Sequence, residues 1–257
     1  MTSTSITLPG LEVSSHGSVR QVTLDRPEKL NAVNADLHES LSNVWQAIAA
    51  DPQARAVVIT GAGKAFSAGG DREFLERIAQ DAQWRYENMR QARRIVQEMI
   101  AFPLPVIAAV NGPAVGLGCS VALLSDLVLM SESAFFADPH VAIGLVAADG
   151  GALCWPLLTS LIRAKEYLFT GDRIDARSAL ELGFANRVVA PEELLEAAHA
   201  LAERLAAQPA QAMRDTKRAV NIHLQRAVGA VLDFAFSAEA ETFTSADFRD
   251  RLAQFGR

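Results

Sequence analysis

The feature that most constrains the fold is a buried strand that runs directly into a glycine-rich turn and then into an apolar helix. The apolar run at 105–110 predicts the strand, and the run at 121–124 predicts the start of the helix. Between them lie Gly116 and Gly118, which lack the Cβ atoms that would keep a ligand away from the backbone. A helix start also leaves N–H groups without partners at the positive end of its dipole. The turn can therefore bind an anionic oxygen, although a tight turn inside a packed α/β domain explains the same pattern.

A second turn of this kind occurs earlier in the chain. Residues 61–71 follow an apolar strand at 56–60 and lead into a helix-like segment at 71–75. Two such turns could each direct one backbone N–H at the same oxygen, which is how an oxyanion hole is built.

The bulk composition excludes several classes of protein. The 257 residues carry 24 basic and 30 acidic side chains, a net charge of −6 without a basic cluster, which argues against a nucleic-acid partner. No apolar run reaches the roughly 18 residues that a bilayer span needs, and the polar N-terminus lacks the order of a signal peptide. Cys119 and Cys154 lie among apolar residues, as buried free thiols do in a reducing compartment. We expect a cytoplasmic protein with no membrane partner.

The remaining patterns predict an α/β chain of repeated strand–strand–helix units followed by an all-helical tail. Asn34 is a candidate N-cap for a helix with an apolar face of Leu37, Leu41, Val44, Trp45 and Ile48, closed by Asp51–Pro52. Further helices are predicted at 82–101, 150–158, 161–170 (ending at Gly171), 175–182, 191–207, 209–226, 228–241 and from 245. Further strands are predicted at 19–24, 127–130, 134–137 and 187–189.

Five ordered segments together resemble the crotonase (enoyl-CoA hydratase/isomerase) superfamily, over roughly residues 10 to 255. The segments that carry the resemblance are 25–32, 64–71, 105–119, 164–171 and 179–189. The resemblance implies a spiral core of ββα units at 1–190 holding an acyl-CoA site, and a helical oligomerisation region at 191–257. It also implies homotrimers or hexamers, and a lyase or isomerase of fatty acid metabolism. Coenzyme A would be part of the substrate, with no other cofactor and no metal.

The same resemblance assigns binding positions. It places a thioester carbonyl between the backbone N–H groups of Ala68 and Leu117, where two donors would stabilise a developing oxyanion. It places coenzyme A along a set of residues near the first turn: Lys29, Leu30, Ala32, Ala68 and Asp71. Lys29 could equally well be a solvent-exposed loop residue that does not bind coenzyme A.

One departure from the family pattern decides what chemistry to expect. A hydratase of this family uses two glutamates to hold and activate one water. The first would stand at Ser120 and the second at His140, after Asp138–Pro139, so both glutamates are absent. A serine hydroxyl is a poor general base, which puts efficient hydration in doubt.

His140 and Asp149 are the candidates to replace those glutamates. A loop could bring the imidazole and the carboxylate together as a base for water or for a C–H next to a carbonyl. Both residues also have a purely structural interpretation. Asp149 could equally well be the N-cap of the helix at 150–158, and His140 could be a loop histidine that only makes hydrogen bonds.

The His140–Asp149 spacing also resembles the β-diketone hydrolase branch, which cleaves a C–C bond and adds a glutamate matched here by Glu239. A more common role for such a glutamate is a solvent-exposed charge on a helix. In addition, the β-diketone hydrolase branch tends to lose the thioester-binding motifs, which this chain keeps. Three hypotheses therefore remain: an acyl-CoA enzyme, a CoA-independent β-diketone hydrolase, and an acyl-CoA-binding subunit without activity.

Overall fold

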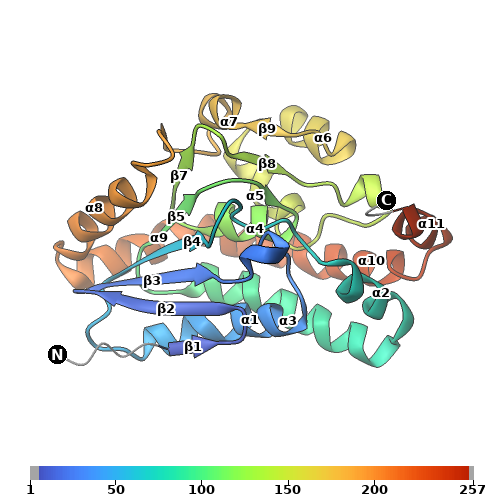
Figure 1. Cartoon of the computed structure of the whole chain (residues 1–257), viewed down its shortest axis with the longest axis horizontal. Coiled ribbons are helices and arrows are strands. Elements are labelled where there is room, and N and C mark those ends of the chain that lie inside the picture. The colour runs from blue at the N-terminus through green and yellow to red at the C-terminus, as the bar shows by residue number, and fades with distance from the viewer. Residues whose placement is uncertain (1–5, 255–257) are drawn as a thin grey trace.

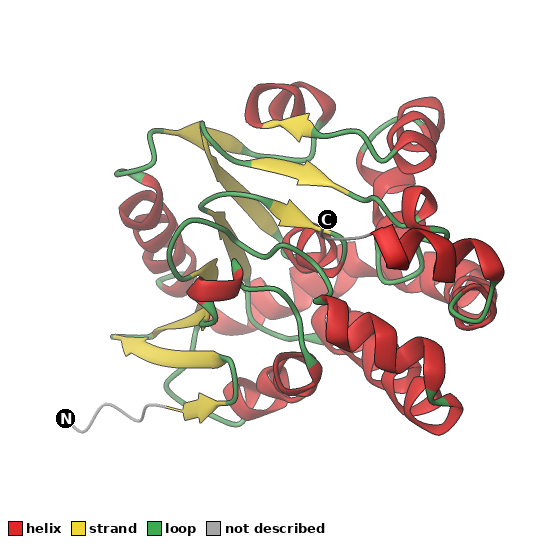
Figure 2. Ribbon diagram, turned by 45° about the vertical axis from the view of Figure 1, so that its right-hand side comes forward, coloured by secondary structure: helices red, strands yellow, loops and turns green. Residues whose placement is uncertain are grey.

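The computed structural model describes residues 6–254 and shows a twisted sheet with helices on both faces (Figures 1 and 2). The larger sheet has the order β1-β2-β3-β4-β5-β7-β10. Its strands are β1 (Ile6–Leu8), β2 (Leu11–His16), β3 (Val19–Leu24), β4 (Ala56–Gly61), β5 (Val106–Val110), β7 (Leu127–Ser131) and β10 (Arg187–Val189). Strands β1 to β3 pair antiparallel, and the pairs from β3 to β10 are parallel.

The central strands are almost entirely apolar because helices cover both of their faces. Every residue of β4 and β5 is buried. Val57 and Ile59 pack on the side of α1 (Ala35–Ala49), α3 (Ala82–Ala101) and α4 (Leu117–Leu124). Alternate residues such as Val58 pack against α8 (Leu194–Ala206) on the other face. The predicted apolar face of α1 is buried, and Asn34 caps the helix by accepting from the Leu37 N–H, which confirms both expectations.

A smaller sheet, β6-β8-β9, lies beside the glycine turn at 111–120. It consists of β6 (Ala114–Val115), β8 (Phe135–Ala137) and β9 (Ile174–Asp175). Sequence patterning did not anticipate β6 or β9, since two residues are too few to show a period. The remaining body helices are α2 (Arg72–Gln80), α5 (Gly151–Leu158), α6 (Leu161–Thr170) and α7 (Ala176–Leu182).

The tail folds back over the body. Helix α9 (Ala210–Ala227) continues through a π turn at Val228–Leu232 into α10 (Asp233–Thr242), and α11 (Ala246–Gln254) follows. The tail therefore contains one continuous helical run where the sequence predicted separate helices at 209–226 and 228–241. Helix α10 packs against α3, and α11 packs against α2, as Figure 1 shows. Among the described residues, no helix combines the length and apolar character needed to cross a bilayer.

These features confirm the predicted fold class, a mixed α/β core of ββα units with C-terminal helices. Both cysteines are free and buried, as expected. The assignment of residues 191–257 to subunit contacts stays a prediction.

Candidate active site

The two glycine turns lie against each other. Ser67 and Ala114 form a parallel β-bridge, and the Val115 N–H donates to the Ser67 carbonyl at 2.9 Å. A Cβ atom on Gly118 would lie 2.6 Å from the Cβ of Ser67, closer than real Cβ contacts come. Glycine at 118 is therefore required for the two turns to approach this closely.

Ala68 and Leu117, the two expected carbonyl-binding residues, line one cavity. Leu117 is the first residue of α4, where helix geometry leaves its N–H without an intrahelical acceptor. The Ala68 N–H, in contrast, donates to the Leu30 carbonyl at 3.0 Å. Of the two expected donors, Ala68 is therefore already engaged by the chain itself.

The loop that supplies the Leu30 carbonyl is held in an unusual conformation. Leu30 and Asn31 both have positive φ, 52° and 54°, which is uncommon outside glycine. The buried Asn31 side chain holds this shape by donating to the Ala62 and Ala65 carbonyls at 2.9 and 2.8 Å. Lys29 and Leu30 are exposed beside it.

Asp71 and Ala32 are tied to this loop through Arg26. The Asp71 carboxylate caps α2 by accepting from the Phe74 N–H at 2.9 Å, and it pairs with the Arg26 guanidinium at 3.2 Å. The same guanidinium donates to the Ala32 carbonyl. Asp71 and Ala32 thus have structural roles, and the expected contact of this loop with coenzyme A stays a prediction.

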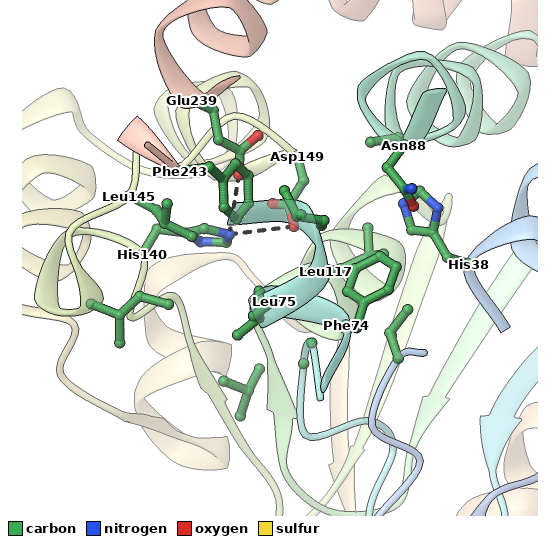
Figure 3. A pocket seen from close by; sticks show the side chains of 18 of the residues that line it. His38, Phe74, Leu75, Asn88, Leu117, His140, Leu145, Asp149, Glu239 and Phe243 are labelled. Atoms are coloured by element: carbon green, nitrogen blue, oxygen red, sulfur yellow. Dashed lines mark ion pairs between the residues drawn. The ribbon is translucent and has the colours of Figure 1, made fainter. Parts of the chain in front are cut away.

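The cavity has a volume of about 140 Å³ and a largely apolar wall. Its apolar side chains come mainly from α2, α3 and the segments around 115 and 145. The polar side chains of the wall form two groups on opposite sides of the view in Figure 3. One group is His140, Asp149 and Glu239, and the other is His38 and Asn88.

His140 is surrounded by three carboxylates from three parts of the chain. Its Nδ1 is hydrogen-bonded to the Asp138 carboxylate. Its Nε2 lies 3.6 Å from Asp149 Oδ2 and 3.8 Å from Glu239 Oε1, the two ion pairs drawn in Figure 3. All four residues are less than a tenth exposed. The structure therefore brings together His140, Asp149 and Glu239, the three side chains that the sequence had singled out.

The burial of these groups changes their protonation. Burial alone lowers the pKa of His140, but the charges of Asp138, Asp149 and Glu239 together raise it well above 6.5. Burial raises the pKa of Asp149, against the His140 charge and the Ser120 hydroxyl, which lower it. Burial likewise raises the pKa of Glu239 to about 8. The carboxylates thus favour the charged imidazolium of His140, and burial favours the uncharged form of Glu239.

Ser120, which occupies the position of the first hydratase glutamate, is hydrogen-bonded to Asp149. Its hydroxyl donates to Asp149 Oδ1 at 2.9 Å in a fully buried bond. The interpretation of Asp149 as an N-cap is wrong, because the N-cap of α5 is Gly150 and no side chain caps that helix. The Asp149 carboxylate turns toward Ser120 and His140 instead.

Sequence reasoning missed the roles of Asp138 and Ser120. The available signal for Asp138 was its place two residues before His140, at the end of β8. The glycine pair after Asp149 was a second signal. A Cβ atom on Gly151 would lie 2.1 Å from Asp138 Oδ2, and one on Gly150 would lie 2.6 Å from the Cβ of Ser120.

Donor atoms of Asp138, His140 and Asp149 lie within 4.8 Å of one another, close enough to surround one cation. His140 Nδ1 is already hydrogen-bonded to the Asp138 carboxylate, so one ring nitrogen is satisfied and the group forms a proton-sharing network.

A comparison with known proteins completes the description of the site. A family model described as "Enoyl-CoA hydratase/isomerase" matches residues 14–256. The chain belongs to the enoyl-CoA hydratase/isomerase family. The crotonase resemblance inferred from the sequence is thereby confirmed.

Relatives within this family include proteins named for different reactions. The chain is 32% identical over 244 residues to the short-chain-enoyl-CoA hydratase of Clostridium acetobutylicum, covering 95% of this chain and 93% of the relative. A crystal structure of an enoyl-CoA hydratase/isomerase from Mycobacterium paratuberculosis matches with a TM-score of 0.93 and 52% identity, covering 96% and 98% of the two chains. A β-diketone hydrolase from the cyanobacterium Anabaena matches with a TM-score of 0.84 and 28% identity, covering 91% and 94%.

Proposed function

We propose that this protein is a lyase or isomerase acting on an acyl-CoA thioester, with His140 and Asp149 transferring protons next to the thioester carbonyl. The observation that carries the proposal is the position of His140 Nε2. It lies within 4 Å of two carboxylates in the cavity that the N-terminus of α4 also lines. An acid and a base that share one largely apolar cavity with a main-chain donor suit proton transfer at carbon.

In this proposal the Leu117 N–H polarises the thioester oxygen. Negative charge develops on that oxygen when a proton leaves the neighbouring carbon, and a fixed donor stabilises it by about 3–4 kcal/mol. The Ala68 N–H is the second donor. In the free protein the Ala68 N–H donates to the Leu30 carbonyl. In the complex it would donate to the thioester oxygen, either in place of the Leu30 carbonyl or to both oxygens at once. Coenzyme A would lie along Lys29, Leu30, Ala32, Ala68 and Asp71.

The proton-transfer roles follow from the surroundings of each group. Asp149, held by the Ser120 hydroxyl, is the carboxylate base. The His140 imidazolium, held by Asp138 at Nδ1, presents its Nε2–H as the acid. Glu239, with its pKa raised by burial to about 8, is a second proton donor at neutral pH. The two glutamates of a hydratase are thus replaced by a different acid–base set.

The test measures exchange of the α-protons of a series of saturated acyl-CoA thioesters in D₂O, together with loss of the enoyl absorbance of unsaturated ones. We expect His140→Gln to lower the exchange rate about 10²- to 10⁴-fold. The matched control is His199→Gln, because His199 lies on α8 and bonds Gln21 outside the cavity. Full exchange in the His140→Gln protein would refute the catalytic part. Saturable thioester binding without exchange or turnover in the wild type would instead favour an acyl-CoA-binding subunit.

A second candidate is a CoA-independent β-diketone hydrolase, for which Glu239 is the specific observation. Its carboxylate reaches His140 from α10, and a β-diketone hydrolase is among the similar structures. The two candidates differ in ligand. Saturable binding of a CoA thioester argues for the first, and hydrolysis of a cyclic β-diketone without thioester binding argues for the second.

The oligomeric state completes the proposal. We expect residues 191–257 to mediate a homotrimer or hexamer, which is supported by exposed apolar side chains on α9 and α10, among them Val220 and Phe234. Light scattering after size-exclusion chromatography measures the mass directly, and a monomer would contradict this expectation.

A further inference from the structure

We propose that the cavity binds an acyl group whose far end carries a hydrogen-bond donor, such as a hydroxyl, that donates to Asn88 Oδ1 beside the imidazole of His38. This inference rests on the proposed function in taking the cavity as the acyl site. It adds the chemical class of the acyl group, which neither the family nor the His140 cluster specifies.

The first observation is an unpartnered oxygen. Asn88 is only 3% exposed, and its Nδ2 donates to the Trp84 carbonyl at 2.9 Å. That bond identifies which amide atom is nitrogen. The remaining Oδ1 is buried and has no hydrogen-bond partner among residues 6–254. A buried acceptor left unpaired is destabilising, and a donor on a ligand would remove that cost.

The second observation is the imidazole of His38, which comes from α1 and lines the same cavity. His38 is 3% exposed, and its Nδ1 is hydrogen-bonded to Gln91 Oε1 at 2.9 Å. An amide oxygen only accepts, so Nδ1 carries the proton and Nε2 is an acceptor. Burial lowers the pKa of His38 to about 4, so the ring is neutral at physiological pH.

These two acceptors lie at one end of the cavity, opposite the carboxylates. Figure 3 shows His38 and Asn88 on one side of the view and His140 with Glu239 on the other. The wall between them is apolar and includes Phe74 and Leu117. A ligand that spans the cavity is therefore bound at one end by the reacting groups and at the other by two acceptors.

The chemistry of this end selects the class of ligand. A hydroxyl has one hydrogen to donate, and the unpartnered Asn88 oxygen is the acceptor for it, whereas a terminal carboxylate would place its charge against two neutral acceptors. A terminal methyl would leave the Asn88 oxygen unpaired, and a site built to bond a hydroxyl discriminates strongly against such an analogue. The volume of about 140 Å³ matches the size of a cavity that holds one benzene ring. We therefore expect a short or single-ring acyl group with a terminal hydroxyl.

The test compares pairs of acyl-CoA thioesters of increasing chain length whose terminal group is either hydroxyl or methyl. Calorimetry should give at least about tenfold tighter binding of the hydroxyl member at the length that reaches Asn88, since 1.4 kcal/mol corresponds to tenfold. A carboxylate-terminated member should bind more weakly than the hydroxyl member. Equal affinities within the pairs at every length would overturn the proposal.

Two variants test the residues themselves. Asn88→Leu should abolish the preference for the hydroxyl-terminated ligand, and His38→Leu should weaken it. Because two variants are used, the test stays decisive if one of them does not fold. The matched control is Asn43→Leu. Asn43 also donates its Nδ2 to the carbonyl one helical turn earlier, at 3.0 Å to Glu39, but it lies outside the cavity. A preference that survives both cavity variants would show that the oxygen is satisfied by an internal water only.

A ligand without coenzyme A separates this inference from the proposed function. If no thioester binds saturably, the proposed function fails, but phenol and toluene still probe the polar end directly. Tighter binding of phenol than of toluene, lost in Asn88→Leu, would support the inference. Equal binding of the two would refute it.

Discussion

Replacing Asp138 by asparagine should uncouple His140 from its charge partner without changing the shape of the site. Asn keeps an oxygen that can accept from Nδ1, so the ring stays oriented, but the carboxylate charge that favours the imidazolium is lost. A hydrogen bond to a charged group contributes about 1.5–3 kcal/mol, and one pKa unit corresponds to 1.36 kcal/mol. We therefore expect the pKa of His140 to fall toward its ordinary value, because the Asp138 charge that raises it is removed.

The sign of the stability effect follows from the direction of the His140 shift. The native pKa of His140 is raised above its ordinary value of 6.5. The stability that this group contributes is fully present below about pH 6.5 and is lost as the pH rises through the native pKa. Asp138→Asn should thus be less stable than the wild type at pH 6, by roughly 1.5–3 kcal/mol, and the difference should shrink as the pH rises through the native pKa of His140.

Three measurements check this prediction. Nitrogen NMR of the imidazole follows the His140 titration, urea unfolding over a pH series that spans this titration gives the stability difference, and α-proton exchange gives the activity. We expect the exchange rate to fall about 10²- to 10⁴-fold, as it does when a catalytic histidine loses its orienting carboxylate. The matched control is Asp126→Asn, which breaks another ion pair, to the buried Lys217 at 2.7 Å, away from the cavity. The reasoning would be refuted by a His140 titration that does not move.

Two further predictions concern the same cluster. Burial raises the pKa of Glu239 from 4.5 to about 8, so the stability of the wild type should fall between about pH 5 and pH 8. Glu239→Gln should lose that part of the pH dependence in urea unfolding, whereas the exposed Glu241→Gln should keep it, and identical curves for both would contradict the assignment. Gly151→Ala would place a Cβ atom 2.1 Å from Asp138 Oδ2, so we expect a loss of about 1–3 kcal/mol in unfolding free energy together with lost exchange activity. Gly229→Ala, which has nothing within 4 Å of the added atom, should be neutral or up to about 1 kcal/mol more stable, and an equal loss in both variants would exclude the steric explanation.

Much of the fold could be predicted because local patterns specify it. The apolar runs of β4 and β5 mark strands covered on both faces, and Asn34 with the apolar period of α1 marks a capped amphipathic helix. The helix at 82–101 and its end before Pro103 follow from the same periodicity and from the restriction that proline imposes. The two-residue strands β6 and β9 carry no such signal. They form only because β8 lies between them in the folded chain.

By itself, the sequence singled out His140, Asp149 and Glu239 as candidate site residues, through their match to positions of a known family. Only the tertiary structure decided which groups these side chains contact. Asp138 rather than Asp149 holds Nδ1, and the Asp149 carboxylate faces Ser120 instead of capping a helix. The same holds for the second polar group, because α1 and α3 bring His38 and Asn88 to one cavity from distant parts of the chain. The physical reason is that patterns of polarity specify which face of an element is buried, whereas hydrogen bonds depend on tenths of an ångström that only the packing of several elements sets.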